Sequence, residues 1–203
     1  MRTLLLFCLL ALPASAADTR RTVVFFGDSL SAGLGVDLEA AFPALIQKKI
    51  DAAGLPWRVV NAGLSGETSA GGRRRINWIL KQPVDCLVLE LGGNDGLRGF
   101  APNETRANLQ AIIDQVRAVN PRVHVLLAGL LMPPNFGEDQ TREFAAIYPA
   151  LAKKNRVALV PFLLASVGGV EELNQADGIH PTAAGHAIVA ATVWKFLQPL
   201  LQP

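Results

Sequence analysis

The sequence predicts an α/β domain in which a parallel β-sheet carries helices on both faces. Two observations support this fold class. Short, almost continuous apolar runs recur along the chain, and segments with apolar residues at helical spacing lie between them. Strands that are buried on both faces give such runs. Because each right-handed crossover returns the chain over the sheet, regular alternation of the two patterns gives a parallel sheet.

Each apolar run is expected to form one strand, which gives a five-stranded sheet. The runs are residues 22–26, 57–60, 84–91, 123–127 and 157–160. A helix is expected before the fourth run, because apolar residues there fall on one stripe and Asn120 and Pro121 end the helical pattern. The stripe consists of Leu109, Ile112, Ile113, Val116 and Val119.

The last helix is expected to begin near Pro181 and Thr182. Its end is expected to fray at Pro199 and Pro203, because proline lacks the N–H that continues a helix. The side chains expected to point inward are those of Ile188, Val189, Val193, Phe196, Leu197 and Leu200.

The first sixteen residues have the pattern of a secretory signal. Arg2 precedes the apolar run 4–12, and Pro13 and the small residues 14–16 follow it. The run is about half of the ~20 apolar residues that a membrane-spanning helix needs. We therefore expect residues 1–16 to be cleaved and the protein to be exported to the periplasm or the exterior.

Residues 17–203 are expected to form one domain. The chain has 203 residues, half of them hydrophobic, and no repeat or Pro/Gly/Ser-rich linker divides it. Cys8 leaves with the signal, so Cys86 is the single cysteine of the mature chain, and its apolar surroundings predict a buried, unreactive thiol. No stable membrane insertion is expected after cleavage.

The charge of the chain indicates no nucleic-acid partner. The net charge is +2, and it becomes +1 when Arg2 is removed with the signal. The one basic cluster, Arg73, Arg74 and Arg75, is interpreted as a solvated helix face, with contact to an acidic leaving group as the alternative.

Small and polar residues follow four of the predicted strands, at positions 27–29, 61–63, 92–94 and 128–129. In open α/β sheets, ligands bind beyond the carboxyl ends of the strands. The functional groups are therefore expected along one edge of the sheet.

Ser29 at this edge is a nucleophile if a histidine takes its proton and an acid orients that histidine. His124 lies within the fourth apolar run and is interpreted as structural, whereas His186 lies in the last helix and either faces solvent or packs against the sheet. His180 differs, because Asp177 precedes it by three residues, a helical spacing that brings the two side chains together. The alternative is a helix cap beside an unrelated histidine. Ser29, Asp177 and His180 are the expected catalytic residues.

Acyl transfer also requires donors for the oxyanion of the tetrahedral intermediate. The candidates are the backbone N–H of Ser29, the backbone N–H of Gly63 and the side-chain amide of Asn94. Gly63 could instead form an ordinary turn, and Asn94 could close a turn through its own side chain. Asp28 and Asp95, which flank these residues, are interpreted as structural groups that bond loop backbone.

These segments resemble the GDSL/SGNH hydrolases, and most closely their bacterial exported thioesterase, lysophospholipase and arylesterase subgroup. The resemblance covers essentially the whole mature chain, in the segments 27–33 (GDSLSAG), 61–68 (NAGLSGET), 91–95 (LGGND), 134–137 (PNFG) and 177–181 (DGIHP). It implies a flavodoxin-like three-layer α/β/α sandwich. It also implies that Ser29 is the nucleophile, that Asp177 and His180 complete the triad, and that Ser29, Gly63 and Asn94 form the oxyanion hole.

An apolar loop after the fourth strand is expected to overhang the same edge. Met132, Pro134 and Phe136 are expected to line an acyl or aryl pocket, with core packing as the alternative, and for Leu130 the two interpretations are equal. No dinucleotide loop, phosphate loop or metal-ligand spacing occurs, so neither a cofactor nor a metal is expected.

The expected function is an exported serine esterase that hydrolyses ester bonds, and thioester bonds, of small acyl or aryl substrates. An alternative within the resembled family is a carbohydrate O-acetylesterase. The non-enzymatic alternative is a flavodoxin-like binding protein that holds a flavin.

Overall fold

The computed structural model describes residues 20–133 and 137–202. Its centre is a five-stranded parallel sheet with the order β2-β1-β3-β4-β5, so the predicted fold class and strand number are confirmed. The strands are β1 (Arg21–Gly27), β2 (Trp57–Asn61), β3 (Cys86–Glu90), β4 (His124–Ala128) and β5 (Ala158–Val160). The predicted signal, residues 1–16, lies outside the described residues.

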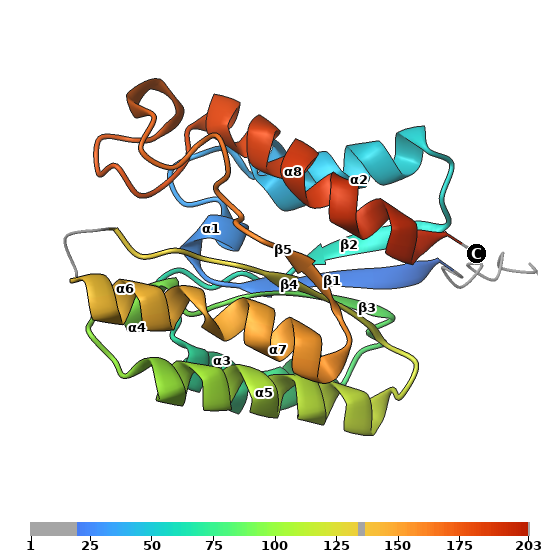
Figure 1. Cartoon of the computed structure of the whole chain (residues 1–203). Coiled ribbons are helices and arrows are strands. Elements are labelled where there is room, and N and C mark those ends of the chain that lie inside the picture. The colour runs from blue at the N-terminus through green and yellow to red at the C-terminus, as the bar shows by residue number, and fades with distance from the viewer. Residues whose placement is uncertain (1–19, 134–136, 203) are drawn as a thin grey trace, which may run out of the picture.

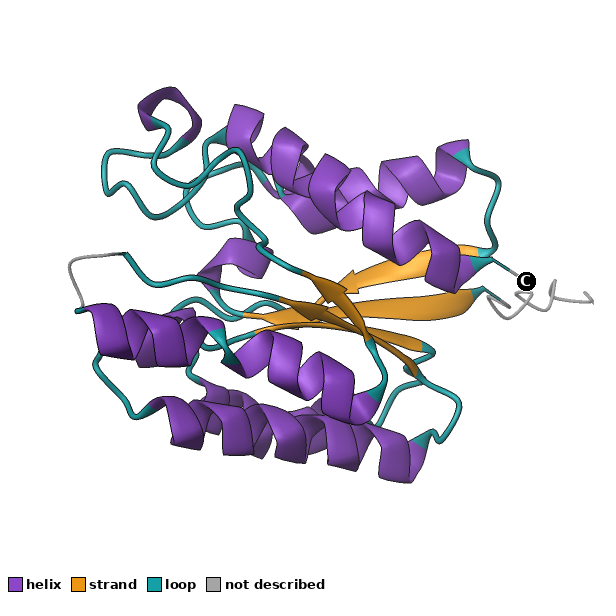
Figure 2. Ribbon diagram, viewed as in Figure 1, coloured by secondary structure: helices purple, strands orange, loops and turns teal. Residues whose placement is uncertain are grey.

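Helices cover both faces of this sheet and give three layers (Figures 1 and 2). One face carries α2 (Phe42–Ala52) and α8 (Ala183–Leu201), and the other carries α3 (Ser69–Ile79), α5 (Pro102–Val119) and α7 (Ile147–Asn155). The shorter elements are α1 (Ser29–Ala32), α4 (Gly93–Leu97), α6 (Glu138–Ala145) and the 3-10 turns η1 (Leu38–Ala40) and η3 (Glu171–Leu173).

The core lies between these layers and is built from the predicted apolar runs. All five residues of β3 are buried, as expected for a central strand covered on both faces. Cys86 in this strand is fully buried as predicted, and burial raises the pKa of its thiol to about 12, which disfavours the reactive thiolate. The helical stripe of α5 faces the core as predicted except at Val119, which is exposed because the chain leaves the helix at Asn120.

The last helix begins where the sequence predicted. Thr182 caps it by accepting a hydrogen bond from the Gly185 N–H, 3.3 Å away. The six predicted side chains are buried or pack against the core. Pro199, however, lies inside the helix, which continues to Leu201. The Leu201 carbonyl accepts a hydrogen bond from the indole of Trp57 at 2.9 Å, and this contact holds the helix end against β2.

None of the described helices combines the length and the apolar character that a membrane-spanning segment requires.

Candidate active site

Ser29 lies at the carboxyl end of β1, where the chain turns sharply into α1. Asp28 caps α1 by accepting a hydrogen bond from the Leu30 N–H at 3.0 Å, which confirms its predicted contact with loop backbone. Gly27 has no room for a side chain, because a Cβ there would lie 2.3 Å from the Ser31 hydroxyl oxygen. The turn therefore requires glycine, and it presents Ser29 at the edge of the sheet.

Ser29, His180 and Asp177 form a continuous chain of hydrogen bonds. The Nε2 atom of His180 is 2.8 Å from the Ser29 Oγ, and its Nδ1 is 2.6 Å from the Asp177 Oδ2. A proton on Nδ1 that is donated to Asp177 leaves Nε2 as an acceptor for the Ser29 hydroxyl. The arrangement can therefore deprotonate Ser29 during nucleophilic attack.

The Asp177 carboxylate is fixed by its own loop. Its Oδ1 accepts hydrogen bonds from the backbone N–H groups of Ile179 at 2.9 Å and His180 at 3.0 Å. The backbone bond from His180 is the main cause that lowers the pKa of Asp177 to about 2. Asp177 is therefore ionised across the neutral and mildly acidic range, as the partner of an imidazolium must be.

Gln175 holds this loop against the loop that follows the nucleophile. Its side-chain amide donates to the carbonyls of Leu34 at 2.7 Å and Pro181 at 3.0 Å, and its backbone N–H donates to the His180 carbonyl at 2.7 Å. Sequence reasoning missed Gln175, because no local pattern indicates a contact with a residue 141 positions away.

The other two histidines lie away from this chain. His124 is at the start of β4, at the opposite end of the strand from the site. His186 is buried, accepts a hydrogen bond from the Phe42 N–H at 3.2 Å and stacks on the Phe42 ring. Burial, with a smaller effect of His180, lowers the pKa of His186 to about 4. Of the two interpretations left open for His186, inward packing is therefore correct.

Asn94 reaches the site through Asp28. One N–H of its side-chain amide donates to the Asp28 Oδ2 at 3.1 Å, and the second N–H takes no part in that bond. Gly63 lies against α1, where a Cβ would be 2.3 Å from the Ala32 N. The N–H of Gly63 donates to the Asn61 Oδ1 at 3.0 Å, and Asn61 in turn donates to the Ser31 carbonyl at 2.8 Å.

Asp95 ties the Asn94 turn to the start of α3. Its carboxylate accepts hydrogen bonds from the Ser69 N–H at 2.8 Å and from the Ser69 and Thr105 hydroxyls. The structural interpretation of Asp95 as a bond to loop backbone is thus confirmed.

Arg75 does not belong to a solvated helix face, so that part of the prediction for the basic cluster is wrong. Its guanidinium bonds both oxygens of the buried Glu67, donates to the Ala62 carbonyl and lies 4.3 Å above the Phe26 ring. Arg75 therefore binds the loop that carries Gly63, through the Ala62 carbonyl and the Glu67 carboxylate. Arg73 and Arg74 are exposed as expected.

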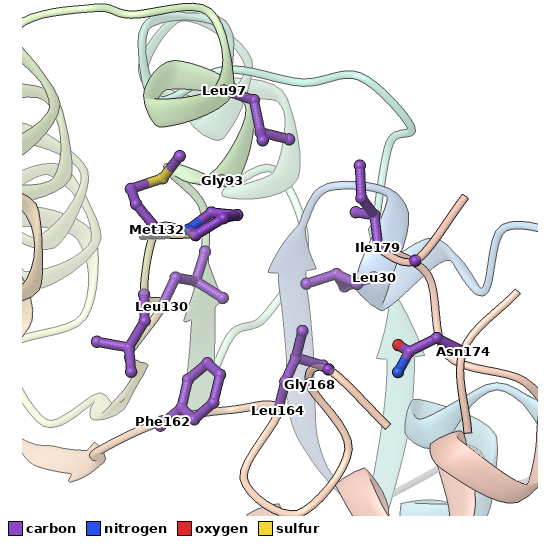
Figure 3. A pocket seen from close by; sticks show the side chains of 14 residues that line it. Leu30, Gly93, Leu97, Leu130, Met132, Phe162, Leu164, Gly168, Asn174 and Ile179 are labelled. Atoms are coloured by element: carbon purple, nitrogen blue, oxygen red, sulfur yellow. The ribbon is translucent and has the colours of Figure 1, made fainter. Parts of the chain in front are cut away.

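A cavity of about 440 Å³ is lined in part by the sequence neighbours of Ser29 and His180 (Figure 3). Leu30 and Ile179, which adjoin these two residues in sequence, lie on one side of it. Leu130 and Met132 lie on the other side, and both are also buried, so for Leu130 the pocket and core interpretations both hold. The predicted lining residues Pro134 and Phe136 lie outside the described residues.

The loop after β5 supplies cavity residues that sequence reasoning missed. Phe162 and Leu164 line the floor, and Gly168 and Asn174 follow them along the chain. The signal in the sequence was the apolar segment 161–167 directly after the fifth strand. Across the described ranges 20–133 and 137–202, no three His, Cys, Asp or Glu side chains are grouped to hold a metal ion.

The geometry agrees with a comparison against known families. A profile of the GDSL-like lipase/acylhydrolase family matches residues 25–188. The chain belongs to this family. The predicted resemblance is thereby confirmed, and so is the prediction that the chain is a carboxylic ester hydrolase.

Characterised relatives match over almost the whole chain. Esterase TesA of Pseudomonas aeruginosa is 44% identical over 203 residues, which cover 99% of this chain and 100% of the relative. Thioesterase 1/protease 1/lysophospholipase L1 of Escherichia coli K12 is 42% identical, covering 97% and 91%. An arylesterase of Vibrio mimicus is 34% identical, covering 93% and 92%. The crystal structure of TesA superposes with a TM-score of 0.85 at 45% identity, covering 89% of this chain and 100% of that one.

Proposed function

We propose that the protein hydrolyses carboxylic esters and thioesters of apolar acyl or aryl groups through an acyl-enzyme on Ser29. The observation that carries this proposal is the hydrogen-bonded chain from Asp177 through His180 to the Ser29 hydroxyl. An isolated serine is a poor nucleophile. His180, at 2.8 Å and with its own carboxylate partner, is placed to activate Ser29 by accepting its proton.

The reaction has two half-steps. The Ser29 Oγ attacks the acyl carbonyl carbon while the His180 Nε2 takes its proton, and the Asp177 carboxylate stabilises the imidazolium. His180 then returns the proton to the departing alcohol or thiol, which leaves the acyl group on Ser29. In the second half-step His180 takes a proton from a water molecule, which attacks the acyl carbon. The bond to Ser29 then breaks, His180 returns the proton to the Ser29 Oγ, and the carboxylic acid is released.

Three N–H groups are proposed to stabilise the oxyanion of each tetrahedral intermediate: those of Ser29, Gly63 and the Asn94 side chain. The bond from Asn94 to Asp28 supports this role, because it fixes the amide plane and directs the second N–H away from Asp28. The N–H of Gly63 takes part when it turns from Asn61 towards the oxyanion or divides its bond between the two acceptors.

The character of the cavity supports an apolar substrate. Its lining is largely aliphatic, with Leu97, Leu131 and Ile179 half-exposed at its mouth. An alkyl chain or aromatic ring buried there gains roughly 25 cal/mol for each Å² of apolar surface removed from water. The carbohydrate O-acetylesterase alternative calls for polar side chains at this position, and Asn174 is the polar side chain among those that line the cavity. The names of the relatives, an esterase, a thioesterase/lysophospholipase and an arylesterase, agree with this substrate class.

We also propose that the enzyme is exported. This proposal rests on the sequence of residues 1–16, which has the charged start, apolar centre and small-residue end of a cleaved signal. N-terminal sequencing of protein recovered outside the cytoplasm tests it. A chain that begins at Ala17 is the expected result, and full-length protein retained in the cytoplasm contradicts it.

Active-site labelling tests the proposed mechanism without a choice of substrate. A fluorophosphonate probe should modify the peptide that contains Ser29, and Ser29→Ala should remove the label. Ser65→Ala is the matched control, because Ser65 is an exposed serine on the neighbouring loop and its replacement should leave labelling intact. A label on any residue other than Ser29, or none in folded protein, overturns the proposal.

A further inference from the structure

Two buried carboxyl groups lie directly beneath the nucleophile turn, and the mechanism above assigns no proton transfer to either. Glu90 is the last residue of β3 and is fully buried, and Asp28 is 2% exposed. The parallel register places Glu90 beside Gly27, one residue before Asp28. The two residues are in direct contact, because the Asp28 N–H donates to the Glu90 carboxylate.

The two oxygens of Glu90 have different surroundings. Its Oε2 accepts three hydrogen bonds, from the Asp28 N–H at 3.2 Å, the Ser31 N–H at 3.2 Å and the Ser31 hydroxyl at 2.8 Å. Its Oε1 is buried and receives no hydrogen bond from any described residue. A buried carboxylate oxygen without a donor is costly, whereas a protonated oxygen needs only an acceptor.

Both oxygens of Asp28, in contrast, accept hydrogen bonds. The Leu30 N–H donates to Oδ1 at 3.0 Å, and the Asn94 amide donates to Oδ2 at 3.1 Å. A carboxylate oxygen that accepts one hydrogen bond keeps a lone pair for a second, so Asp28 can also accept a hydrogen bond from a protonated Glu90. Donors at both oxygens favour the ionised form of Asp28, whereas the Oε1 of Glu90 has none.

No cation neutralises a second negative charge in this cluster, as far as the described residues extend. The other titratable groups that act on the pair are His180, whose charge lowers the pKa of Asp28, and the buried Tyr148, whose hydroxyl donates to the Leu91 carbonyl at 2.9 Å. Burial raises the pKa of Glu90 well above its usual range, and the charge of Asp28 raises it further. Burial also raises the pKa of Asp28, to about 6, against the lowering effect of the bonds from Leu30 and Asn94. The Oε1 without a donor and these two raised pKa values together favour one proton shared by the pair.

We propose that Glu90 is a positioning residue that holds this proton on Oε1 and donates it to the Asp28 carboxylate. The ionised Asp28 then orients the Asn94 amide, and the Oε2 of Glu90 holds the backbone of the nucleophile turn. This proposal rests on the proposed function, because the orientation of Asn94 matters when its second N–H binds an oxyanion.

The isosteric amides at the two positions should behave differently. In Glu90→Gln the new side chain can keep an acceptor where Oε2 lies and place its NH₂ group where Oε1 lies, so it reproduces the neutral acid. In Asp28→Asn the new side chain cannot reproduce the carboxylate, because either orientation turns one accepting oxygen into a donor that faces the Leu30 N–H or Asn94. We expect Glu90→Gln to keep kcat within about threefold of the wild type, whereas Asp28→Asn lowers kcat by ~10–100-fold with little change in KM.

Two further measurements separate positioning from simple structural support. The pH profile of kcat in Glu90→Gln should keep the acid limb of the wild type, because the donor to Asp28 is retained. Infrared spectra at neutral pH should contain the carbonyl band of a protonated carboxylic acid, and this band should be absent from Glu90→Gln. The spectra do not depend on turnover, so they test the protonation of Glu90 even if a variant is inactive.

The outcomes distinguish this proposal from the proposed function. Wild-type protein that fluorophosphonate does not label at Ser29 refutes the proposed function. With Ser29 labelled normally, any of three results overturns the role of Glu90: a tenfold or larger loss of kcat in folded Glu90→Gln, wild-type kcat in Asp28→Asn, or no carboxylic-acid band in the wild type.

Discussion

Replacement of Asn94 by alanine is the most direct test of the oxyanion hole. The change removes the amide that bonds Asp28 and, in the proposed mechanism, one of three N–H donors to the transition state. Loss of one such donor lowers kcat by ~10²–10³, or roughly 2.7–4 kcal/mol of transition-state stabilisation. Because the proposed substrate is bound mainly through the apolar cavity, KM should change much less than kcat.

The same replacement has a cost for folding that the structure also predicts. The buried Asp28 Oδ2 loses its amide donor, which lowers the free energy of unfolding by about 1–3 kcal/mol. For a domain of this size, that corresponds to a fall in Tm of roughly 2–12 °C. The loss of this bond also raises the pKa of Asp28.

The assay compares kcat, KM and Tm for the wild type, Asn94→Ala and a control, Asn77→Ala. Asn77 is an exposed asparagine on α3, so the control should match the wild type in all three quantities. Rates are measured with a p-nitrophenyl ester, and the folded fraction is counted by fluorophosphonate labelling. A wild-type kcat for folded Asn94→Ala removes Asn94 from the oxyanion hole, and a large rise in KM at constant kcat shows that it acts in substrate binding instead.

Three other predictions follow from the site and its surroundings. Ser29→Ala and His180→Ala should each remove nearly all turnover while far-ultraviolet circular dichroism stays unchanged, and substantial residual turnover in either refutes the triad. His186 is buried and neutral, with a pKa lowered from 6.5 to about 4, so the unfolded chain binds the extra proton between these values. Its stabilising contribution, on the order of 3 kcal/mol, is present above pH 6.5 and is lost as the pH falls towards 4; denaturant titrations should find this loss in the wild type and not in His186→Gln. Met132→Ala combined with Phe136→Ala should change the preference among p-nitrophenyl esters from acetate to palmitate, and an unchanged preference rules out their role in the cavity.

The sheet could be predicted from the sequence because its strands are buried on both faces. Burial on both faces leaves a local signal, an unbroken apolar run, that is present whatever the distant contacts are. The end of α5 at Asn120 was predicted correctly, but the burial of Val119 was not, because periodicity alone does not tell where a helix leaves the core.

The candidate catalytic residues were also predictable, for a different reason. Asp177 and His180 lie three residues apart, and their contact forms as expected, but in a non-helical turn with Gly178 at φ 69° and not in the helical turn that the spacing predicted. The topology then brings Ser29 to the same edge. Gln175 and Arg75 were missed or misinterpreted because their partners are set by tertiary structure. When the partner of a polar side chain is distant in sequence, no local pattern tells whether that side chain is solvated or forms a buried hydrogen bond.

Glu90 combines a local sequence signal with contacts that only the tertiary structure sets. It is an acidic residue at the end of an apolar strand, where exposure to solvent would be expected. Glu90 is nevertheless fully buried. Burial of an ionised carboxylate costs several kcal/mol, so the residue is tolerated only if the proton it retains or the bonds it accepts serve the neighbouring backbone. Its Oε2 accepts three hydrogen bonds from the turn that carries Ser29, so Glu90 meets this condition. A charged residue in an apolar strand run, two residues before the Gly-Gly-Asn turn, is therefore a sequence signal for a residue that positions the site. Glu90→Gln tests whether the retained proton is what makes the burial of Glu90 tolerable.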